Sequence, residues 1–158
     1  MNKKFVKLIC ILTITVLSIS SFTACSIGRS KEPVEIVTLL TDDSIMDRYL
    51  KAVEDYGKVE YEQVALSYGR TDALGPSDYR FRGIVYLTDE EAARLLEEYE
   101  WNEVTSPEFE FKEVNTDVIG EGPWYRCSEF EKDNCSIAMG SYKILFDGKN
   151  LVFDMRQA

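Results

Sequence analysis

The segment Tyr79–Leu87 (YRFRGIVYL) constrains the fold of this chain most, because its side chains alternate in character with a period of two. Successive residues of a strand point to opposite faces of a sheet. One face is aromatic and aliphatic around a glycine (Tyr79, Phe81, Gly83, Val85 and Leu87). The other face holds two arginines and two apolar residues (Arg80, Arg82, Ile84 and Tyr86). We predict a strand of an antiparallel sheet with one buried and one solvated face.

A helix is predicted directly after this strand. Thr88 stands at the N-cap position, and Glu91 three residues later completes a capping box. The predicted buried stripe consists of Ala92, Leu95, Leu96 and Tyr99. The acidic residues of the helix are expected to lie largely on its solvated face (Glu90, Glu91, Glu97 and Glu98).

Residues 33–67 predict a second set of elements on the N-terminal side. The β-branched run 33–40 indicates a strand, and residues 59–67 indicate another. Between them, Ser44 is the predicted cap of a helix with Asp47 three residues on, and Gly57 ends it. The apolar stripe of this helix is Met46, Tyr49, Leu50 and Val53. Residues 69–78 have the composition of a loop.

The C-terminal third of the chain favours strands. Phe109 and Phe111 alternate with charged residues after Pro107, as in a strand. Two apolar runs, 142–146 and 151–153, flank the turn sequence Asp147–Asn150 (DGKN), which predicts a hairpin. One face of this hairpin is expected to hold Tyr142, Ile144, Phe146, Leu151, Phe153 and Met155 in either register.

This order of elements predicts an α+β domain over residues 34–158. Its sheet is mainly antiparallel, two helices pack on one face, and a β-hairpin closes the chain. A ferredoxin-like core is one way to connect such elements.

The N-terminus differs in kind from the rest. Lys3, Lys4 and Lys7 precede an apolar run over residues 8–17, and small residues follow. As a helix this run spans about 15 Å, roughly half of a hydrocarbon core, so a secretory signal peptide is favoured over a membrane span. We predict that residues 1–24 are this signal peptide.

The end of the segment, Phe22-Thr23-Ala24-Cys25, resembles the lipobox of bacterial lipoproteins, although Phe22 stands where Leu is usual. The resemblance implies cleavage between Ala24 and Cys25 by signal peptidase II, with a diacylglyceryl group on the sulfur of Cys25. Residues 25–33 would then be the lipidated cysteine and a short tether. The protein would be anchored on the extracytoplasmic face of a bacterial membrane. The alternative is an ordinary signal peptide cut after Ala24.

Charge excludes several functions. The chain has 18 Lys+Arg, 28 Asp+Glu and no His, for a net charge of −10. Removal of residues 1–24, with three lysines and no acid, leaves 15 cations against 28 carboxylates and a net charge of −13. This balance argues against nucleic acid as a partner. Without His the chain lacks Ser-His-Asp and Cys-His catalysis and the commonest zinc ligand sets, so we predict neither metal nor cofactor.

Two cysteines of the mature chain, Cys127 and Cys135, are separated by seven residues. An exported location permits a disulfide between them, worth about 2.6 kcal/mol by loop entropy. A zinc site would need two further ligands.

Two groups of residues are candidates for a binding surface. The loop 120–125 (GEGPWY) places Trp124 and Tyr125 beside turn residues, either as exposed anchors for a partner or as the start of a core strand. Arg80, Arg82 and Tyr86 either contact a partner or pair with nearby acids on the sheet surface.

The sequence therefore predicts a membrane-anchored binding domain that is not an enzyme. An immunity-type protein that captures a cationic peptide is the specific version, because a charge of −13 would steer such a ligand. The alternatives are a cell-envelope hydrolase that uses carboxylates alone and a structural envelope assembly factor.

Overall fold

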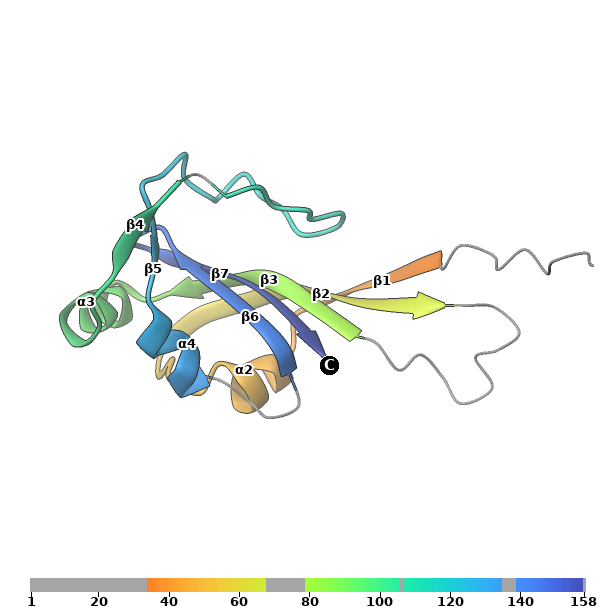
Figure 1. The fold of residues 1–158 in the computed structure, drawn as a ribbon, viewed down its shortest axis with the longest axis horizontal. Helices are drawn as coiled ribbons and strands as arrows, with labels where there is room; N and C mark the ends of the chain where they lie inside the picture. The colour runs from red at the N-terminus through yellow and green to blue at the C-terminus, as the bar shows by residue number, and fades with distance from the viewer. Residues whose placement is uncertain (1–33, 68–78, 106, 135–138, 158) are drawn as a thin grey trace, which may run out of the picture. The chain divides into compact units, whose positions relative to one another are not determined.

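Seven antiparallel strands form one sheet in the computed structural model, which describes residues 34–67, 79–105, 107–134 and 139–157 (Figure 1). The strands are β1 (Val34–Leu40), β2 (Tyr56–Ser67), β3 (Tyr79–Leu87), β4 (Asn102–Val104), β5 (Trp124–Arg126), β6 (Met139–Phe146) and β7 (Asn150–Gln157). Their order across the sheet is β1-β2-β3-β7-β6-β5-β4. The helices are α2 (Ser44–Tyr49), α3 (Asp89–Glu98) and α4 (Ser128–Asn134).

The predicted α+β class is confirmed, including the C-terminal hairpin of β6 and β7. The described residues hold three helices rather than two, because α4 was not predicted. This seven-residue helix (SEFEKDN) has Phe130 as its only large apolar side chain, so it shows no helical stripe in the sequence.

The ferredoxin-like connection is wrong. Such a core is built from split β-α-β units, in which a helix joins parallel strands. Here α2 joins β1 to β2, yet these two strands pair directly and antiparallel, with Val34 opposite Ser67. Because α2 ends at Tyr49, long before the predicted end at Gly57, the chain turns back beside the strand that it has just left.

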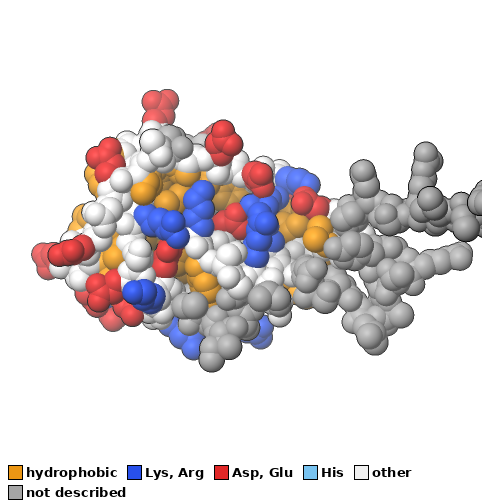
Figure 2. All heavy atoms as spheres, in the orientation of Figure 1, with side chains coloured by type: hydrophobic (Ala, Val, Ile, Leu, Met, Phe, Trp, Pro, Cys, Tyr) orange, Lys and Arg blue, Asp and Glu red, His pale blue; other side chains and the backbone are white. Residues whose placement is uncertain are grey.

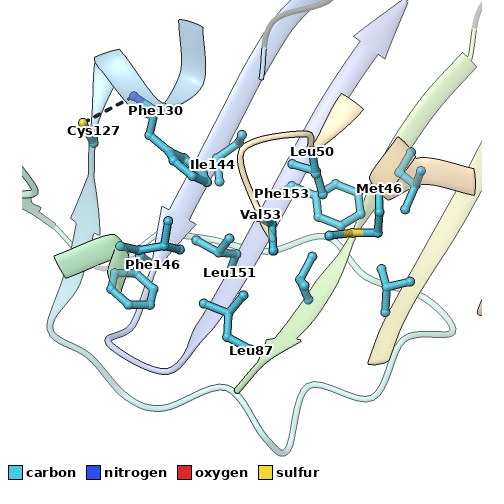
Figure 3. Packing of buried hydrophobic residues seen from close by; sticks show 14 of the residues in the cluster. Met46, Leu50, Val53, Leu87, Cys127, Phe130, Ile144, Phe146, Leu151 and Phe153 are labelled. Carbon is cyan, nitrogen blue, oxygen red and sulfur yellow. Dashed lines mark hydrogen bonds between the residues drawn. The ribbon is translucent and has the colours of Figure 1, made fainter. Parts of the chain in front are cut away.

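The three helices cover one face of the sheet, which we call the helix face (Figure 1). Figure 3 shows its core, where Met46 and Leu50 of the α2 region meet Phe153, and Phe130 of α4 lies beside Ile144. The hairpin face is confirmed, since Ile144 pairs with Phe153 in the same core. The other predicted members of that face also belong to this cluster (Tyr142, Phe146, Leu151 and Met155).

Gly83 lies on the helix face of β3, opposite Tyr61 of β2 and Phe153 of β7. A Cβ atom at Gly83 would stand 2.4 Å from the Cβ of Tyr61 and 2.4 Å from the backbone oxygen of Glu60. Tyr61, only 2% exposed, crosses this position. Glycine is therefore required here by the close approach of β2.

The helix starts differ in detail from the prediction. Ser44 is the first residue of α2, and Asp43 takes the N-cap position without a side-chain hydrogen bond. Thr88 does cap α3, because its Oγ1 accepts a hydrogen bond from the Glu91 amide at 3.2 Å.

Glu91 is buried rather than solvated, at 3% exposure. Its carboxylate accepts hydrogen bonds from the Glu54 amide and from the guanidinium of Arg94, instead of reaching back to the N-cap residue as in a capping box. The partners of this carboxylate lie in another segment and on the next turn of α3, which compensates for its burial.

Residues 107–123, which we call the strap, cross the second face of the sheet opposite the helices (Figure 1). The predicted strand around Phe109 and Phe111 is wrong, since these residues pair with no strand. Their rings stack on each other at 5.7 Å and pack with Ile84, Leu145 and Val152 of the sheet. The alternation of apolar and charged residues at 108–112 therefore reflects two rings of the strap that cover the sheet, and not a strand.

Candidate functional site

The second face of the sheet carries the predicted strand residues Arg80, Arg82 and Tyr86. Arg80 forms a forked ion pair with Asp154 of β7, at 2.8 and 2.5 Å, and a further contact with Glu110 of the strap at 2.9 Å. Tyr86 donates a hydrogen bond to Glu60 at 2.6 Å. Figure 2 shows lysine and arginine side chains gathered over β6 and β7, interspersed with acidic ones.

Arg82 and Glu62 form a buried ion pair on this face, with Nε 2.6 Å from Oε2 and exposures of 2% and 0%. The other carboxylate oxygen of Glu62 accepts hydrogen bonds from three consecutive backbone amides of the strap. The distances are 2.5 Å for Lys112 and Glu113 and 3.1 Å for Val114. Glu62 therefore fastens the strap to the sheet.

The titration of these groups follows from their contacts. Burial raises the pKa of Glu62. Hydrogen bonds from the Glu113 amide, from Arg82 and from neighbouring amides lower it, and their combined effect is larger than that of burial. The pKa of Glu62 therefore lies below its ordinary value. Burial and the bond to Glu60 raise the pKa of Tyr86. The arginines are paired with acids, as one of the two sequence interpretations predicted. The predicted solvated face of this strand is wrong, because the strap covers it and leaves Arg82 and Ile84 only 2% and 0% exposed.

Trp124 and Tyr125 begin strand β5 rather than an exposed loop. Trp124 is 2% exposed and packs edge-to-face with Phe109 at 5.1 Å between ring centroids. Tyr125 is half-buried against the helix-face core. The second-face and loop residues therefore stabilise the sheet and strap, and the structure does not bring the two groups together as one open surface.

Other predicted positions lie partly or wholly outside the described residues. Ala24, Cys25 and the whole of residues 1–33 lie outside them, as does Cys135. Cys127 is buried, and its Sγ accepts a hydrogen bond from the Phe130 amide at 3.5 Å (Figure 3). Because Cys135 lies outside the described residues, the disulfide between the two stays a prediction.

A groove that the sequence did not predict opens beside α2, with a volume of about 450 Å³. Its walls come from α2, from the turn before it and from the adjoining parts of β1, β2, β3 and β7. The lining residues are Leu40, Asp42, Ser44, Ile45, Arg48, Tyr49, Tyr61, Gln63, Tyr79, Phe81 and Gln157. Of these described lining residues, one is acidic, one is basic and four are aromatic.

The aromatic wall of this groove is centred on Phe81. Its ring lies 5.8 Å from that of Tyr49, 6.4 Å from that of Tyr61 and 6.3 Å from that of Tyr79, with the last pair stacked at 17°. Tyr49, Tyr79 and Phe81 are half-buried. Such rings offer rigid contact area and a negative π-face to a ligand.

Asp42 stands at the rim with a fixed carboxylate. Its Oδ1 accepts hydrogen bonds from the Ser44 amide at 3.0 Å and from the Tyr61 hydroxyl at 3.1 Å. The Ser44 hydroxyl lies 3.1 Å from the same Tyr61 oxygen. Hydrogen bonding from Ser44, with a further contribution from Tyr61, lowers the pKa of Asp42, so this group is an anion at neutral pH.

The groove was missed because its residues come from separate elements. Tyr79 and Phe81 were assigned to a buried strand face, and Tyr49 to a helix stripe, which is correct for each element alone. The one available signal was that the face of β3 carries aromatic rings at its start, beyond the reach of the short helix α2.

Comparisons add no relative, since the chain matches no protein-family model, no curated protein and no solved structure. In the described ranges no group of three or more Cys, Asp or Glu side chains is placed to hold a metal ion. None of the helices α2, α3 and α4 combines the length and apolar character needed to cross a membrane.

Proposed function

We propose that this protein is a lipid-anchored, extracytoplasmic binding domain that captures a cationic peptide in the groove beside α2. The observation that carries the binding role is the juxtaposition of three half-buried aromatic rings, those of Tyr49, Tyr79 and Phe81, with the ionised carboxylate of Asp42. The lipobox-like segment around Cys25 supports the location, because a diacylglyceryl anchor would hold the domain at a membrane surface.

The groove suits the ammonium or guanidinium group of a peptide side chain. A cation within about 6 Å of an aromatic centroid is attracted by the ring quadrupole, and the Asp42 carboxylate supplies a counter-charge beside Tyr61. Arg48 is the one positive charge among the described residues of the lining, so we expect the cation to lie on the Asp42 side. The mature net charge of −13 would steer a cationic ligand toward the domain.

The hydrolase alternative has less support. It requires a carboxylic acid whose pKa is raised so that it holds a proton. In the described part of the chain, each carboxyl group with a clear change has a lowered pKa (Glu35, Asp42, Glu60, Glu62, Glu91 and Glu110). We therefore propose binding rather than carboxylate catalysis.

The binding role is tested by titrating the protein with a fluorescent decalysine peptide at low and high salt. Asp42→Asn is expected to weaken binding roughly three- to tenfold, and Tyr79→Ala by a similar factor. Arg48→Gln should tighten binding, because it removes the repulsive charge. The matched control is Asp117→Asn in the exposed strap, which changes net charge equally and should have little effect. Equal weakening by Asp42→Asn and Asp117→Asn would show that only net charge matters and would contradict the groove.

The anchor is tested separately by metabolic labelling with a radioactive fatty acid. Cys25→Ala should abolish incorporation of the label, because it removes the thiol that receives the diacylglyceryl group. The control is Cys10→Ala, which alters a cysteine of the apolar run and should leave labelling intact. Unchanged labelling of Cys25→Ala would refute lipidation without bearing on the groove.

A further inference from the structure

Strand β1 lies at one end of the sheet and pairs, among the described strands, with β2 alone. Its other edge presents backbone N–H and C=O groups to which another strand can bond. The strand at the opposite edge, β4, is shorter and more polar. It has three residues, Asn102, Glu103 and Val104, of which two are polar. Short and polar edges resist pairing with other chains, whereas β1 has seven residues and no proline.

The side chains of β1 are unusually apolar for an exposed edge. Val34, Ile36 and Leu39 are 65%, 52% and 46% exposed. They are three of the five large hydrophobic side chains that are exposed in the described part of the chain. Val34 and Ile36 lie on one face of β1 and Leu39 on the other, so apolar side chains flank the outer edge of this strand on both faces. Exposed apolar side chains along an edge indicate that it is covered in the working protein.

The single charge of β1 does not protect the edge. Glu35 is held by Lys112 of the strap, with Nζ 2.6 Å from Oε2. Hydrogen bonding to Lys112 is the main cause that lowers the pKa of Glu35. The pair is neutral as a unit, so β1 lacks the unpaired charges that keep edge strands apart.

We propose that β1 pairs antiparallel with β1 of a second copy of this chain, about a two-fold axis through Val37, so that the two sheets become continuous. The sequence VEIVTLL suits this symmetric register. Val37 lies opposite its own copy, Ile36 opposite Thr38, and Val34 opposite Leu40. Glu35 faces Leu39, so the register sets no like charges against each other.

A second copy suits this edge better than a strand of another protein. A two-fold contact uses the same patch twice, so Val34 meets Leu40 and Ile36 meets Thr38, while Leu39 meets Glu35, whose charge is already paired with Lys112. The pairing shares only Leu40 with the lining of the groove beside α2. Its test measures association of two chains and not peptide binding, so the outcome is independent of peptide capture.

The test exploits the position of Val37 on the two-fold axis. Full-length chains with two different C-terminal tags are co-expressed, extracted in mild detergent and purified by one tag, and the amount of the other is measured. Val37→Lys paired with itself, and Val37→Glu paired with itself, should each reduce co-purification roughly tenfold, because like charges then face each other. Val37→Lys paired with Val37→Glu should restore it.

Circular dichroism confirms that each variant is folded, and Thr38→Lys gives a second variant, off the axis, that should disrupt pairing less than Val37→Lys. Restoration in the mixed pair is specific to a symmetric contact. A wild-type chain that fails to co-purify would overturn the proposal. Loss of co-purification in both Val37 variants without restoration in the mixed pair would also overturn it, because this would indicate that β1 pairs with another segment or protein. Retention of co-purification in both single variants would overturn it as well, because any dimer contact would then lie elsewhere.

Discussion

Replacement of Glu62 by glutamine tests whether one buried carboxylate holds the strap on the sheet. Glu62 is fully buried and accepts four hydrogen bonds, three from strap amides and one from Arg82. Glutamine has nearly the same shape but only one acceptor oxygen. In either orientation its NH₂ group would face a donor, and the charge of Arg82 would lose its buried partner.

The expected cost is set by the charge that is left behind. Breaking a buried ion pair by removing one partner costs about 3–5 kcal/mol. Arg82 is 2% exposed and its nearest remaining carboxylate, that of Glu110, lies 4.0 Å away. We therefore expect Glu62→Gln to lower the free energy of unfolding by about 4 kcal/mol, a large share of a typical total of about 5–15 kcal/mol.

Urea denaturation followed by tryptophan fluorescence is a suitable assay, because Trp124 lies against Phe109 of the strap. The matched control is Glu60→Gln, on the same face of β2, which should cost about 1 kcal/mol because Glu60 is only half-buried. Arg82→Met should cost less than Glu62→Gln, since three amides still hold the carboxylate. Equal effects of Glu62→Gln and Glu60→Gln would refute this account of the strap.

The pH dependence has a defined sign. The pKa of Glu62 in the folded protein lies below that of an unfolded chain, so its contribution is complete above the unfolded value of about 4.3. It is lost as the pH falls through the lower, folded value. Glu62→Gln should remove this part of the acid sensitivity, and an unchanged acid unfolding curve would contradict it.

Two further substitutions test local features by the same denaturation assay. Gly83→Ala should cost about 2–3 kcal/mol, because the added Cβ meets Tyr61 and the β2 backbone at 2.4 Å; a neutral result would show that the strands separate easily. Thr88→Ala should cost about 1 kcal/mol by removing the cap on the Glu91 amide, and Thr88→Ser should restore it; equal losses from both would contradict capping.

Sequence patterns predicted correctly those elements that carry a clear local signal, such as a regular apolar repeat, a capping residue or a turn sequence. The alternation of β3, the cap of α3 and the turn of the C-terminal hairpin are short-range signals, and each is present in the structure. The strap shows where such reasoning fails. Phe109 and Phe111 alternate as in a strand, yet nothing local records that their backbone has no neighbouring strand.

The buried charges were unpredictable for a different reason. In a chain with 28 acidic residues, each carboxylate is expected to be solvated. Glu62 and Glu91 are exceptions because distant segments, the strap and residue 54, bring amide donors to them. The groove beside α2 likewise depends on the short length of that helix, which leaves Tyr79 and Phe81 partly uncovered.

The measurement that tests the central claim most directly is photo-crosslinking in living cells, with a photoreactive phenylalanine placed at Tyr79 in the groove. The matched control carries the same group at Leu96, which was predicted to be buried but is 52% exposed on α3, and which lies outside the groove lining. A binding groove predicts a distinct crosslinked product at Tyr79, identified by mass spectrometry as a lysine- or arginine-rich peptide, and none at Leu96. No product at Tyr79, or the same products at both positions, would contradict capture in the groove.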